Sequence, residues 1–460
     1  MSEFISTLAT GVWTPVLFLL ILGGLFFLVY SRFIPYKYIG HSISILRGKY
    51  DNPDDPGQIN AYQALSTALA STVGMGNIAG VAAAIAIGGP GALFWMWGTA
   101  LVGMSTNFFT STLSVMFKGK DSAGEIQGGP MYVIREALGR PWYPLAVLFC
   151  LCTSIGCLPI FQANQLTQII VDVGITSESI KRSSFSIGSF EINTAKFFIG
   201  TTLMIISGIV IIGGIQRIGK WAGNMVPLMI VVYFLSVITI LILNITKIPT
   251  YLGMIFMDAF AARHYHGDPL FGGIVGGLIV TGVRRASFSN EAGIGTAPMA
   301  LGASKSREPI REGLVSMVSP AIDTLIVCTL TALAILVTDV WKTSEANGVS
   351  LTVKAFENTL GTPGKFLLLI SAFFFAITSL FSYSYYGNKA LSFLFGVEAG
   401  KYYNYFYLVT IVFGAILSMQ DIMNIIDIAY ALMAIPTMVS GFILAPKVMK
   451  EARGYFGRLK

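Results

Sequence analysis

The residues best placed to bind a ligand lie at positions 70–80, inside an apolar run from about residue 61 to 87. Gly74, Gly76 and Gly80 stand there among small polar residues, and glycine is a weak helix former. Because the run is long enough to cross a bilayer, its composition predicts a spanning helix that is broken near its middle. The two helix ends would offer N–H groups to an anion and carbonyl groups to a cation. The alternative is an unbroken helix that packs closely on a neighbour through its small residues.

A second break is predicted at residues 288–298, a stretch that is more polar than the first and contains Glu291. A carboxylate at membrane depth is costly, and it indicates a functional role by default. Glu291 could instead be structural, either capping N–H groups freed by the break or pairing with Arg284 or Arg285. Both roles stay open, since a cap can also be part of a site.

Polar side chains in other apolar runs are further candidates. The run at residues 143–172 carries four amides, Gln162, Asn164, Gln165 and Gln168. Gln165 and Gln168 share a helix face, and amides can donate to a carboxylate and accept from an ammonium group. Their alternative role is to hold helices together. Asp323 and Asp427 could bind an ion or a proton, but a salt bridge or a structural network is favoured for each.

The composition identifies the kind of protein that positions these residues. The chain of 460 residues is 54% hydrophobic and 12% charged, with a mean hydropathy of +0.71, whereas soluble domains are roughly 25% charged. This is the composition of a polytopic membrane protein. The net charge of +7 resides mainly in short loops, which suggests orientation signals and contact with membrane lipid, and gives no support for nucleic-acid binding. No nucleophile with its base and no metal cluster is visible in the apolar runs, so an enzyme is not expected.

Eleven apolar runs predict eleven transmembrane helices in an all-α protein. They lie near residues 12–31, 61–88, 91–117, 143–172, 196–213, 221–244, 271–302, 313–337, 366–387, 403–418 and 421–446. With the N-terminus outside the cell, most of the 30 lysine and arginine residues fall in the inner loops and tail. This asymmetry favours an extracellular N-terminus and a cytoplasmic C-terminus.

Two halves of the chain echo each other. Gly74-Met75-Gly76 matches Gly293-Ile294-Gly295 at a spacing of 219 residues, and Pro90 matches Pro309 at the same spacing. The short segment 129–139 matches 348–361 at nearly that spacing. Each unit holds five helices, and an odd number inverts the second copy across the membrane. The predicted organisation is an extra helix and linker at 1–60, repeats at 61–244 and 245–446, and a basic cytoplasmic tail at 447–460.

The motifs in these helices resemble a known family. Residues 88–97, Gly-Gly-Pro-Gly-Ala-Leu-Phe-Trp-Met-Trp, resemble the signature of the alanine or glycine:cation symporter family. Residues 288–293 look like its second hallmark, and the Gly-Gly-Pro-Met-Tyr segment at 128–132 also fits. One departure is Gly98, where an aliphatic residue is expected, but it lies outside the predicted site. The likeness covers nearly the whole chain, and it implies sodium-coupled uptake of small neutral amino acids on two inverted five-helix repeats.

A more distant likeness links residues 73–77, Val-Gly-Met-Gly-Asn, to the sodium-coupled leucine-type transporters. That likeness implies that N–H groups at the first break hold the substrate carboxylate. It also implies a sodium site made of the carbonyls of Ala70 and Val73 with the hydroxyls of Thr378 and Ser379. Taken alone, the hydroxyl pair would more simply bond back to the preceding helical turn.

We therefore predict a secondary active transporter of the cell membrane, a sodium-coupled symporter of alanine or glycine that works by alternating access and acts as a monomer without a cofactor. Met75, Phe288 and Ile294 would crowd an apolar subsite, so alanine should fit better than leucine. The predicted substrate-binding residues are Thr72, Gly74, Met75, Gly76, Asn77, Gln165, Gln168, Phe288, Gly293 and Ile294. The alternatives are proton coupling through Glu291 or Asp323, and a passive channel or membrane receptor for a small zwitterion.

Overall fold

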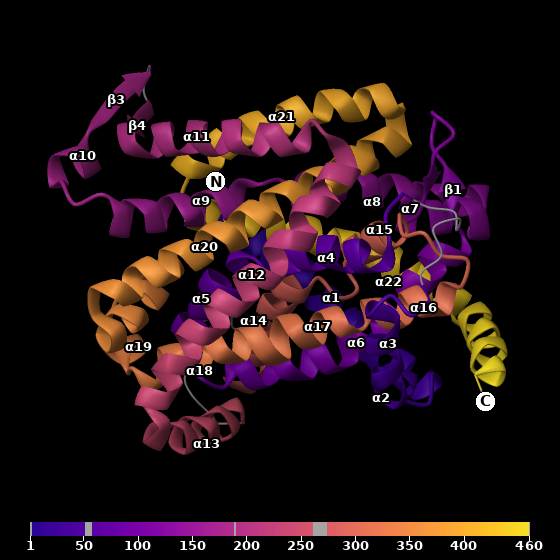
Figure 1. The fold of residues 1–460 in the computed structure, drawn as a ribbon, viewed down its shortest axis with the longest axis horizontal. Helices are drawn as coiled ribbons and strands as arrows, with labels where there is room; N and C mark the ends of the chain where they lie inside the picture. Colours follow the sequence, from indigo (N-terminus) through magenta and orange to yellow (C-terminus); the bar gives the residue numbers. More distant parts are fainter. Residues whose placement is uncertain (1, 51–57, 188–189, 261–273, 460) are drawn as a thin grey trace.

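The computed structural model describes residues 2–50, 58–187, 190–260 and 274–459. Helices dominate it, and the longest of them run through one bundle from end to end (Figure 1). Two short antiparallel hairpins add to the predicted all-α architecture: β1 (Gly119–Lys120) with β2 (Ile126–Gln127), and β3 (Ser184–Ile187) with β4 (Phe190–Asn193). Both hairpins lie in connections between long helices, so they leave the helical bundle unchanged.

The first half of the chain alternates long helices with short ones. The long helices are α1 (Ser2–Tyr30), α6 (Ala92–Met116), α11 (Thr194–Ile211) and α12 (Gly214–Leu243), together with α8 (Tyr143–Gly156) and α9 (Ile160–Ile169), which follow each other closely as the two parts of one span. Shorter elements lie between them: α2 (Ile34–Lys37), α3 (Ile39–Leu46), α4 (Ala61–Thr72), α5 (Val81–Gly88), α7 (Pro130–Val133) and α10 (Glu178–Arg182).

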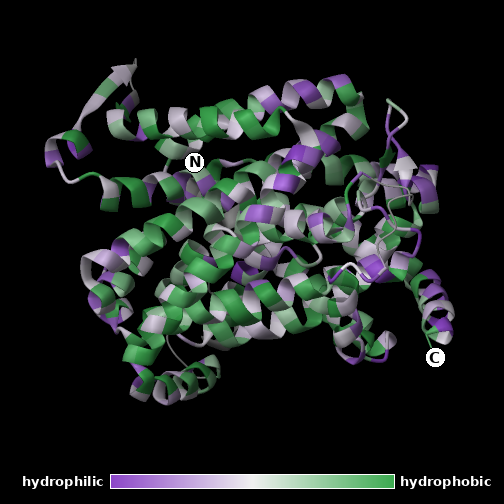
Figure 2. Ribbon diagram, in the orientation of Figure 1, coloured by the Kyte–Doolittle hydropathy of each residue, from purple (hydrophilic) through white to green (hydrophobic). Residues whose placement is uncertain are grey.

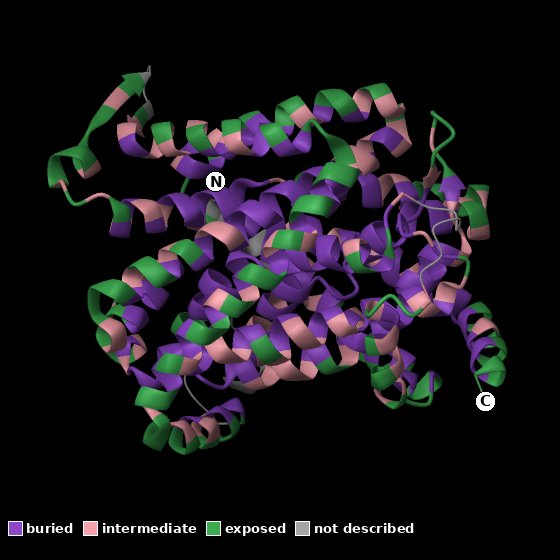
Figure 3. Ribbon diagram, in the orientation of Figure 1, coloured by how far each residue is buried: buried purple, intermediate pink, exposed green. Residues whose placement is uncertain are grey.

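The second half begins with α13 (Ile248–Ala259). It continues through α14 (Ile274–Asn290), α15 (Thr296–Leu301), α16 (Pro309–Ser316), a π-helix at Ala321–Cys328, α18 (Thr329–Val337), α19 (Val340–Thr343), α20 (Val349–Phe395), α21 (Val397–Ile416) and α22 (Met419–Arg458). The buried residues gather along the centre of the bundle, whereas the outer helices α11 and α21 alternate buried and exposed turns (Figure 3). Hydrophobic residues also cover much of the exposed helical surface (Figure 2), as a lipid-facing surface requires.

Seven helical stretches of the described chain are long and apolar enough to cross a membrane, or eight if the bent pair Ala61–Thr72 and Gly76–Gly88 forms one span. The protein is therefore a multi-pass membrane protein. The other predicted spans correspond to α6, to α14 with α15, and to α21. Buried hydroxyl and amide side chains lower the hydropathy of α6, among them Ser105, Thr106 and Asn107. The second break divides the span predicted at 271–302, whose first three residues lie outside the described part of the chain.

The first predicted break is confirmed. Helix α4 begins with a capping box formed by Asn60 and Gln63 and ends at Thr72. A π-helix (Gly76–Gly80) then leads into α5, and the two parts are bent by 45°. Between them, Val73 N–H still bonds to the Leu69 carbonyl, whereas the N–H groups of Gly74 and Met75 bond to side chains, so backbone groups leave the helical pattern in the middle of the bundle.

The second predicted break is confirmed as well. Helix α14 ends at Asn290, and α15 begins only at Thr296. Glu291 (φ 54°), Gly293 (φ 82°) and Gly295 (φ 111°) have left-handed backbone conformations, which are costly for residues other than glycine. The strain at Glu291 therefore marks a position that the surrounding structure holds firmly.

Two further helical stretches contain breaks; the first is not predicted from the sequence, whereas the second, at Gly361, falls where the sequence closes the short segment 348–361. The run at residues 143–172 is divided into α8 and α9 near Cys157 and Pro159, because proline lacks an N–H donor and disfavours a helical residue before it. Helix α20 is interrupted at Gly361, where φ is 63°.

The short segments that echo each other in sequence also share their ends. Gly129 and Gly139 bound the first, Gly348 and Gly361 bound the second, and all four glycines have a positive φ. Both segments are helical between these glycines. The correspondence between the segments therefore extends from the sequence to the backbone.

Candidate functional site

The N–H groups freed at the first break point to side-chain oxygen atoms. Gly74 N–H donates to Asn77 Oδ1 at 2.8 Å, and Met75 N–H donates to Gln162 Oε1 at 3.0 Å. These residues are buried, at 2% exposure or less for Met75, Asn77 and Gln162. The break thus presents two adjacent donors, and each is bonded to an amide oxygen that a carboxylate oxygen could replace.

Asn77 also connects the first break to the second. Its amide Nδ2 donates to Asp323 Oδ1 at 2.6 Å, and Ser289, one residue before the end of α14, donates to Asp323 Oδ2 at 2.9 Å. Thr324 Oγ1 donates to the same carboxylate oxygen at 2.7 Å. Asp323 therefore occupies a buried hydrogen-bond network between the two broken helices, which is one of the two roles that the sequence favours for it.

Helix α20 reaches the carbonyl side of the first break through Ser379. Ser379 Oγ lies 2.9 Å from the carbonyl oxygen of Ala70 and also 2.9 Å from that of Phe375 in its own helix. Thr378 Oγ1 instead bonds back to the carbonyl of Phe374 at 2.8 Å and approaches Met229 Sδ of α12. Of the predicted hydroxyl pair, Ser379 is the one whose bonds join α20 to the break.

Gly74 lies where these groups converge. A Cβ atom at this position would be 2.3 Å from Ser379 Oγ and 3.4 Å from Gln162 Oε1. A side chain would therefore displace the Ser379 hydroxyl, which bonds to the Ala70 carbonyl, and would crowd Gln162 Oε1. Gly76 differs, because a Cβ there would make only ordinary contacts of 3.5 Å with Phe288 and Ser289.

The predicted amides Gln165 and Gln168 make their hydrogen bonds away from the break. Gln165 Oε1 accepts from Val349 N–H at the start of α20, and its amide donates to Asn164. Gln168 donates to Asp172, which in turn accepts from Ser350. Both glutamines thus connect α9 to the start of α20. The amide that contacts the break is Gln162, which sequence spacing alone could not distinguish from its neighbours.

The predicted apolar residues are buried, and the Phe288 ring lies against the first break at Gly76. The Phe288 ring packs edge-on against Phe161, with ring centroids 4.8 Å apart, and lies near Tyr430. Met75 and Ile294 are fully buried. Thr72 bonds back to Ala68 within its own helix. Gly293 faces away from the first break, since a Cβ there would meet Leu20 of α1 and Met438 of α22.

Glu291 is fully buried and is bound by hydroxyl groups. Its carboxylate accepts from Tyr383 of α20 at 2.6 Å, from Tyr430 of α22 at 3.1 Å, and from Thr296 at the start of α15. Arg284 and Arg285 lie instead on Asp427, each with Nη2 2.6 Å from Oδ2. Glu291 therefore does not pair with these arginines, which was one of the predicted alternatives. The salt bridge favoured for Asp427 is confirmed.

The variant Glu291→Gln distinguishes a structural role of this carboxylate from a role in proton coupling. If the carboxylate is structural, Glu291→Gln should keep sodium-driven uptake and lower the free energy of unfolding by about 1 kcal/mol, because one acceptor oxygen is lost. If Glu291 carried a coupled proton, the variant would retain exchange of internal for external substrate but lose net accumulation. We expect the first result. Exchange without accumulation would contradict it, with Tyr430→Phe as the control that removes one donor and keeps the carboxylate.

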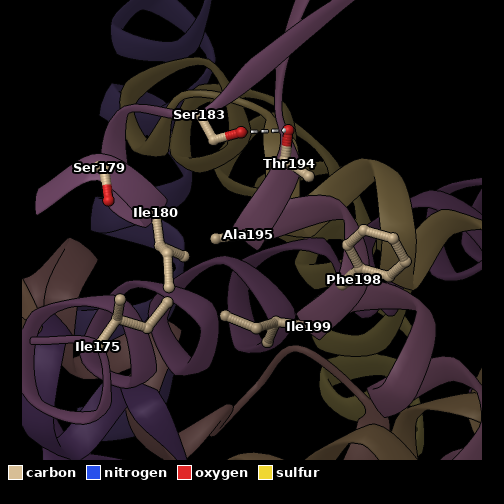
Figure 4. A pocket seen from close by; sticks show the side chains of 8 residues that line it. All are labelled: Ile175, Ser179, Ile180, Ser183, Thr194, Ala195, Phe198 and Ile199. Carbon is tan, nitrogen blue, oxygen red and sulfur yellow. Dashed lines mark hydrogen bonds between the residues drawn. The ribbon is translucent and has the colours of Figure 1, made fainter. Parts of the chain in front are cut away.

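A cavity of about 490 Å³ lies away from both breaks. It is lined by Ile175, Ser179, Ile180, Ser183, Thr194, Ala195, Phe198 and Ile199. Figure 4 shows isoleucine and phenylalanine side chains around it, with Ser183 bonded to Thr194 at one rim. It lies between α10 and α11 and brings none of the predicted site residues together, so it is not the candidate site.

Comparisons with known proteins place this geometry in context. The profile described as the sodium:alanine symporter family matches residues 1–460. The chain is 34% identical to the sodium/alanine symporter AgcS of Methanococcus maripaludis, over 98% of this chain and 97% of that protein. It is also 34% identical to the putative sodium/proton-dependent alanine carrier protein YrbD of Bacillus subtilis, over 86% of this chain and 79% of that protein. The fold is similar to the crystal structure of MhsT in complex with L-phenylalanine, with a TM-score of 0.60 at 16% identity, covering 85% of this chain and 89% of that one.

Proposed function

The chain belongs to the sodium:alanine symporter family, and from this premise we propose that it carries alanine or glycine into the cell together with sodium by alternating access. It is a transporter and not an enzyme, because its family and its relatives are transporters. The observation that carries the proposal is the meeting of Ser379 Oγ and the Ala70 carbonyl at the first break, 2.9 Å apart.

The sodium site proposed at this point consists of the carbonyls of Ala70 and Val73 and the hydroxyls of Ser379 and Thr378. All are neutral oxygen donors, which suit a hard monovalent cation. The Ala70 carbonyl has lost its partner within α4, because Gly74 N–H bonds instead to Asn77 Oδ1 and to the Thr72 carbonyl, and it accepts a hydrogen bond from Ser379 Oγ.

The substrate site is proposed on the other side of the break. The carboxylate would accept from the N–H groups of Gly74 and Met75 in place of Asn77 Oδ1 and Gln162 Oε1. Gln162 can then turn its amide and donate to the same carboxylate. Phe288 and Met75 leave little room for a side chain, which favours alanine or glycine.

We propose eleven transmembrane helices in the arrangement predicted from the sequence. An extra helix and linker (1–60) precede two inverted repeats (61–244 and 245–446), and a basic tail (447–460) follows in the cytoplasm. The two breaks at corresponding positions and the matched positive-φ glycines support the repeats. The distribution of lysine and arginine supports an extracellular N-terminus.

Proton coupling is the second candidate, because Asp323 is fully buried and accepts hydrogen bonds from three neutral side chains. The name of the relative YrbD mentions both ions. We favour sodium because the oxygen groups around the first break can bind it without a change in protonation.

The proposed sodium site is tested by replacing the hydroxyl residues Ser379 and Thr378 one at a time. Ser379→Ala should raise the sodium concentration for half-maximal uptake roughly tenfold, since it removes an oxygen that faces the break. Thr378→Ala should have the smaller effect, because its hydroxyl bonds within α20. The measurement is initial alanine uptake against sodium concentration at saturating alanine. An unchanged half-saturation in Ser379→Ala, or a larger effect of Thr378→Ala, would contradict the proposed geometry.

A further inference from the structure

The segment that follows α1 turns sharply at the end of the bundle. Arg32 (φ 54°) and Phe33 (φ 61°) are consecutive residues in the left-handed region, and neither is glycine. Such a turn is unfavourable for each residue and persists only where the surroundings hold it. It leads from α1 into α2 and α3, which lie at the edge of the bundle near the end where the chain terminates (Figure 1). Residues 31–47 are called the linker segment below.

One face of α3 is attached to the protein. Ser42 and Ile45 are buried. The Tyr38 ring stacks on Phe456 of α22, with centroids 3.9 Å apart, and His41 bonds to Tyr455 at 2.7 Å. This face fixes the position of the linker segment against the tail of α22.

The other face of α3 is apolar and exposed. Ile39 and Ile43 are 40% and 45% exposed and share a face at i, i+4, and Phe33 is 49% exposed. Phe26 and Val29, near the end of α1, are exposed as well. Exposed apolar side chains that gather on one helix face mark a site of contact with a partner or a membrane.

The charges of the linker segment indicate which kind of partner it contacts. Its three fully ionised residues are basic, Arg32, Lys37 and Arg47, all of them exposed, and it contains no aspartate or glutamate. Arg47 follows Ile43 by four residues and so extends the same apolar face. Basic residues beside an apolar face are typical of helices that lie in the headgroup region of anionic membranes.

We propose that the linker segment binds anionic phospholipid in the adjacent leaflet. Phe33, Ile39 and Ile43 contact the acyl chains just below the headgroups. Arg32, Lys37 and Arg47 contact the phosphates, their aliphatic stems lying along the apolar surface. The segment directly follows the apolar span Gly11–Tyr30, and its basic residues beside exposed apolar side chains favour an anionic lipid surface over a soluble protein or a second copy of the chain. The proposal does not depend on which substrate or ion the protein transports.

The test uses a bimane fluorophore on a single introduced thiol. The cysteines native to the sequence, Cys150, Cys152, Cys157 and Cys328, are all buried, so a surface thiol can be labelled selectively. Ile43→Cys reports on the apolar face. Gly454→Cys is the matched control on the tail of α22, at an exposed position where a Cβ meets nothing within 4 Å. Both proteins are reconstituted into vesicles of phosphatidylcholine and phosphatidylglycerol in which one lipid is brominated.

We expect brominated lipid to quench bimane at position 43 and not at 454, and iodide in the buffer to do the reverse. Brominated phosphatidylglycerol should quench more than brominated phosphatidylcholine at equal fraction, with an enrichment of about fivefold for one basic residue at the surface. The combined variant Arg32→Gln, Lys37→Gln, Arg47→Gln should lose this preference and keep the quenching. Iodide access at 43 without lipid quenching would overturn the proposal, as would equal quenching by the two lipids in the parent protein.

Discussion

Replacement of Gly74 by alanine is expected to reduce sodium-driven alanine uptake roughly 10- to 100-fold, through an overpacking cost of about 1–3 kcal/mol. The added Cβ would lie 2.3 Å from Ser379 Oγ and 3.4 Å from Gln162 Oε1. One substitution therefore disturbs the groups proposed for the ion and the group proposed for the substrate. The measurement is initial uptake and the sodium half-saturation in proteoliposomes, with folding checked by thermal unfolding in detergent.

The matched control is Gly76→Ala, two residues further along the same break. Its Cβ would make ordinary contacts of 3.5 Å with Phe288 and Ser289, so we expect uptake close to that of the parent protein. If Gly74→Ala folded and transported normally, or if Gly76→Ala were the more severe change, the convergence of α9 and α20 at Gly74 would not form the site.

Asp427→Asn is expected to be strongly destabilising, lowering the free energy of unfolding by about 3–5 kcal/mol, because it removes the buried carboxylate that two guanidinium groups share. The side chain of Asp427 is 1% exposed, and the guanidinium groups of Arg284 and Arg285 each lie 2.6 Å from its Oδ2. Its backbone carbonyl also accepts from Trp13 of α1. The change should therefore loosen α22 from α14 and leave the attachment of α1 less well supported.

Thermal unfolding in detergent measures this effect against an exposed control. Glu398→Gln removes the partner of Lys401, a pair 2.7 Å apart whose side chains are 77% and 63% exposed, and such exposed pairs contribute little to stability because water screens them. An unchanged Tm in Asp427→Asn would show that the arginines do not depend on this carboxylate.

The sequence predicts the breaks because their causes are local. Gly74 and Gly76 weaken the first helix, and Gly293 and Gly295 permit backbone angles that no helix contains. The same reasoning misses the division at Cys157 and Pro159, because the apolar run at 143–172 continues on both sides of the proline and resembles one span. The hairpins lie in polar connections, where short strands leave little periodicity to detect.

The partners of the site residues are harder to predict, because they come from helices that are distant in the sequence. Tyr383 and Tyr430 donate hydrogen bonds to Glu291. Each lies in an apolar run, and no sequence motif distinguishes it from the other tyrosines. Gln162 is one of four amides on the same stretch, and only the packing of α9 against the first break shows that it is the one that meets Met75.

The central claim is that a sodium gradient drives the uptake of a small neutral amino acid. The most direct test is accumulation of labelled alanine by the purified protein in proteoliposomes, with an inward sodium gradient and equal pH on both sides. We predict accumulation above the external concentration that collapses when sodium is equalised, and none when a proton gradient replaces the sodium gradient. Accumulation driven by protons alone, or equilibration without accumulation under the sodium gradient, would contradict the account.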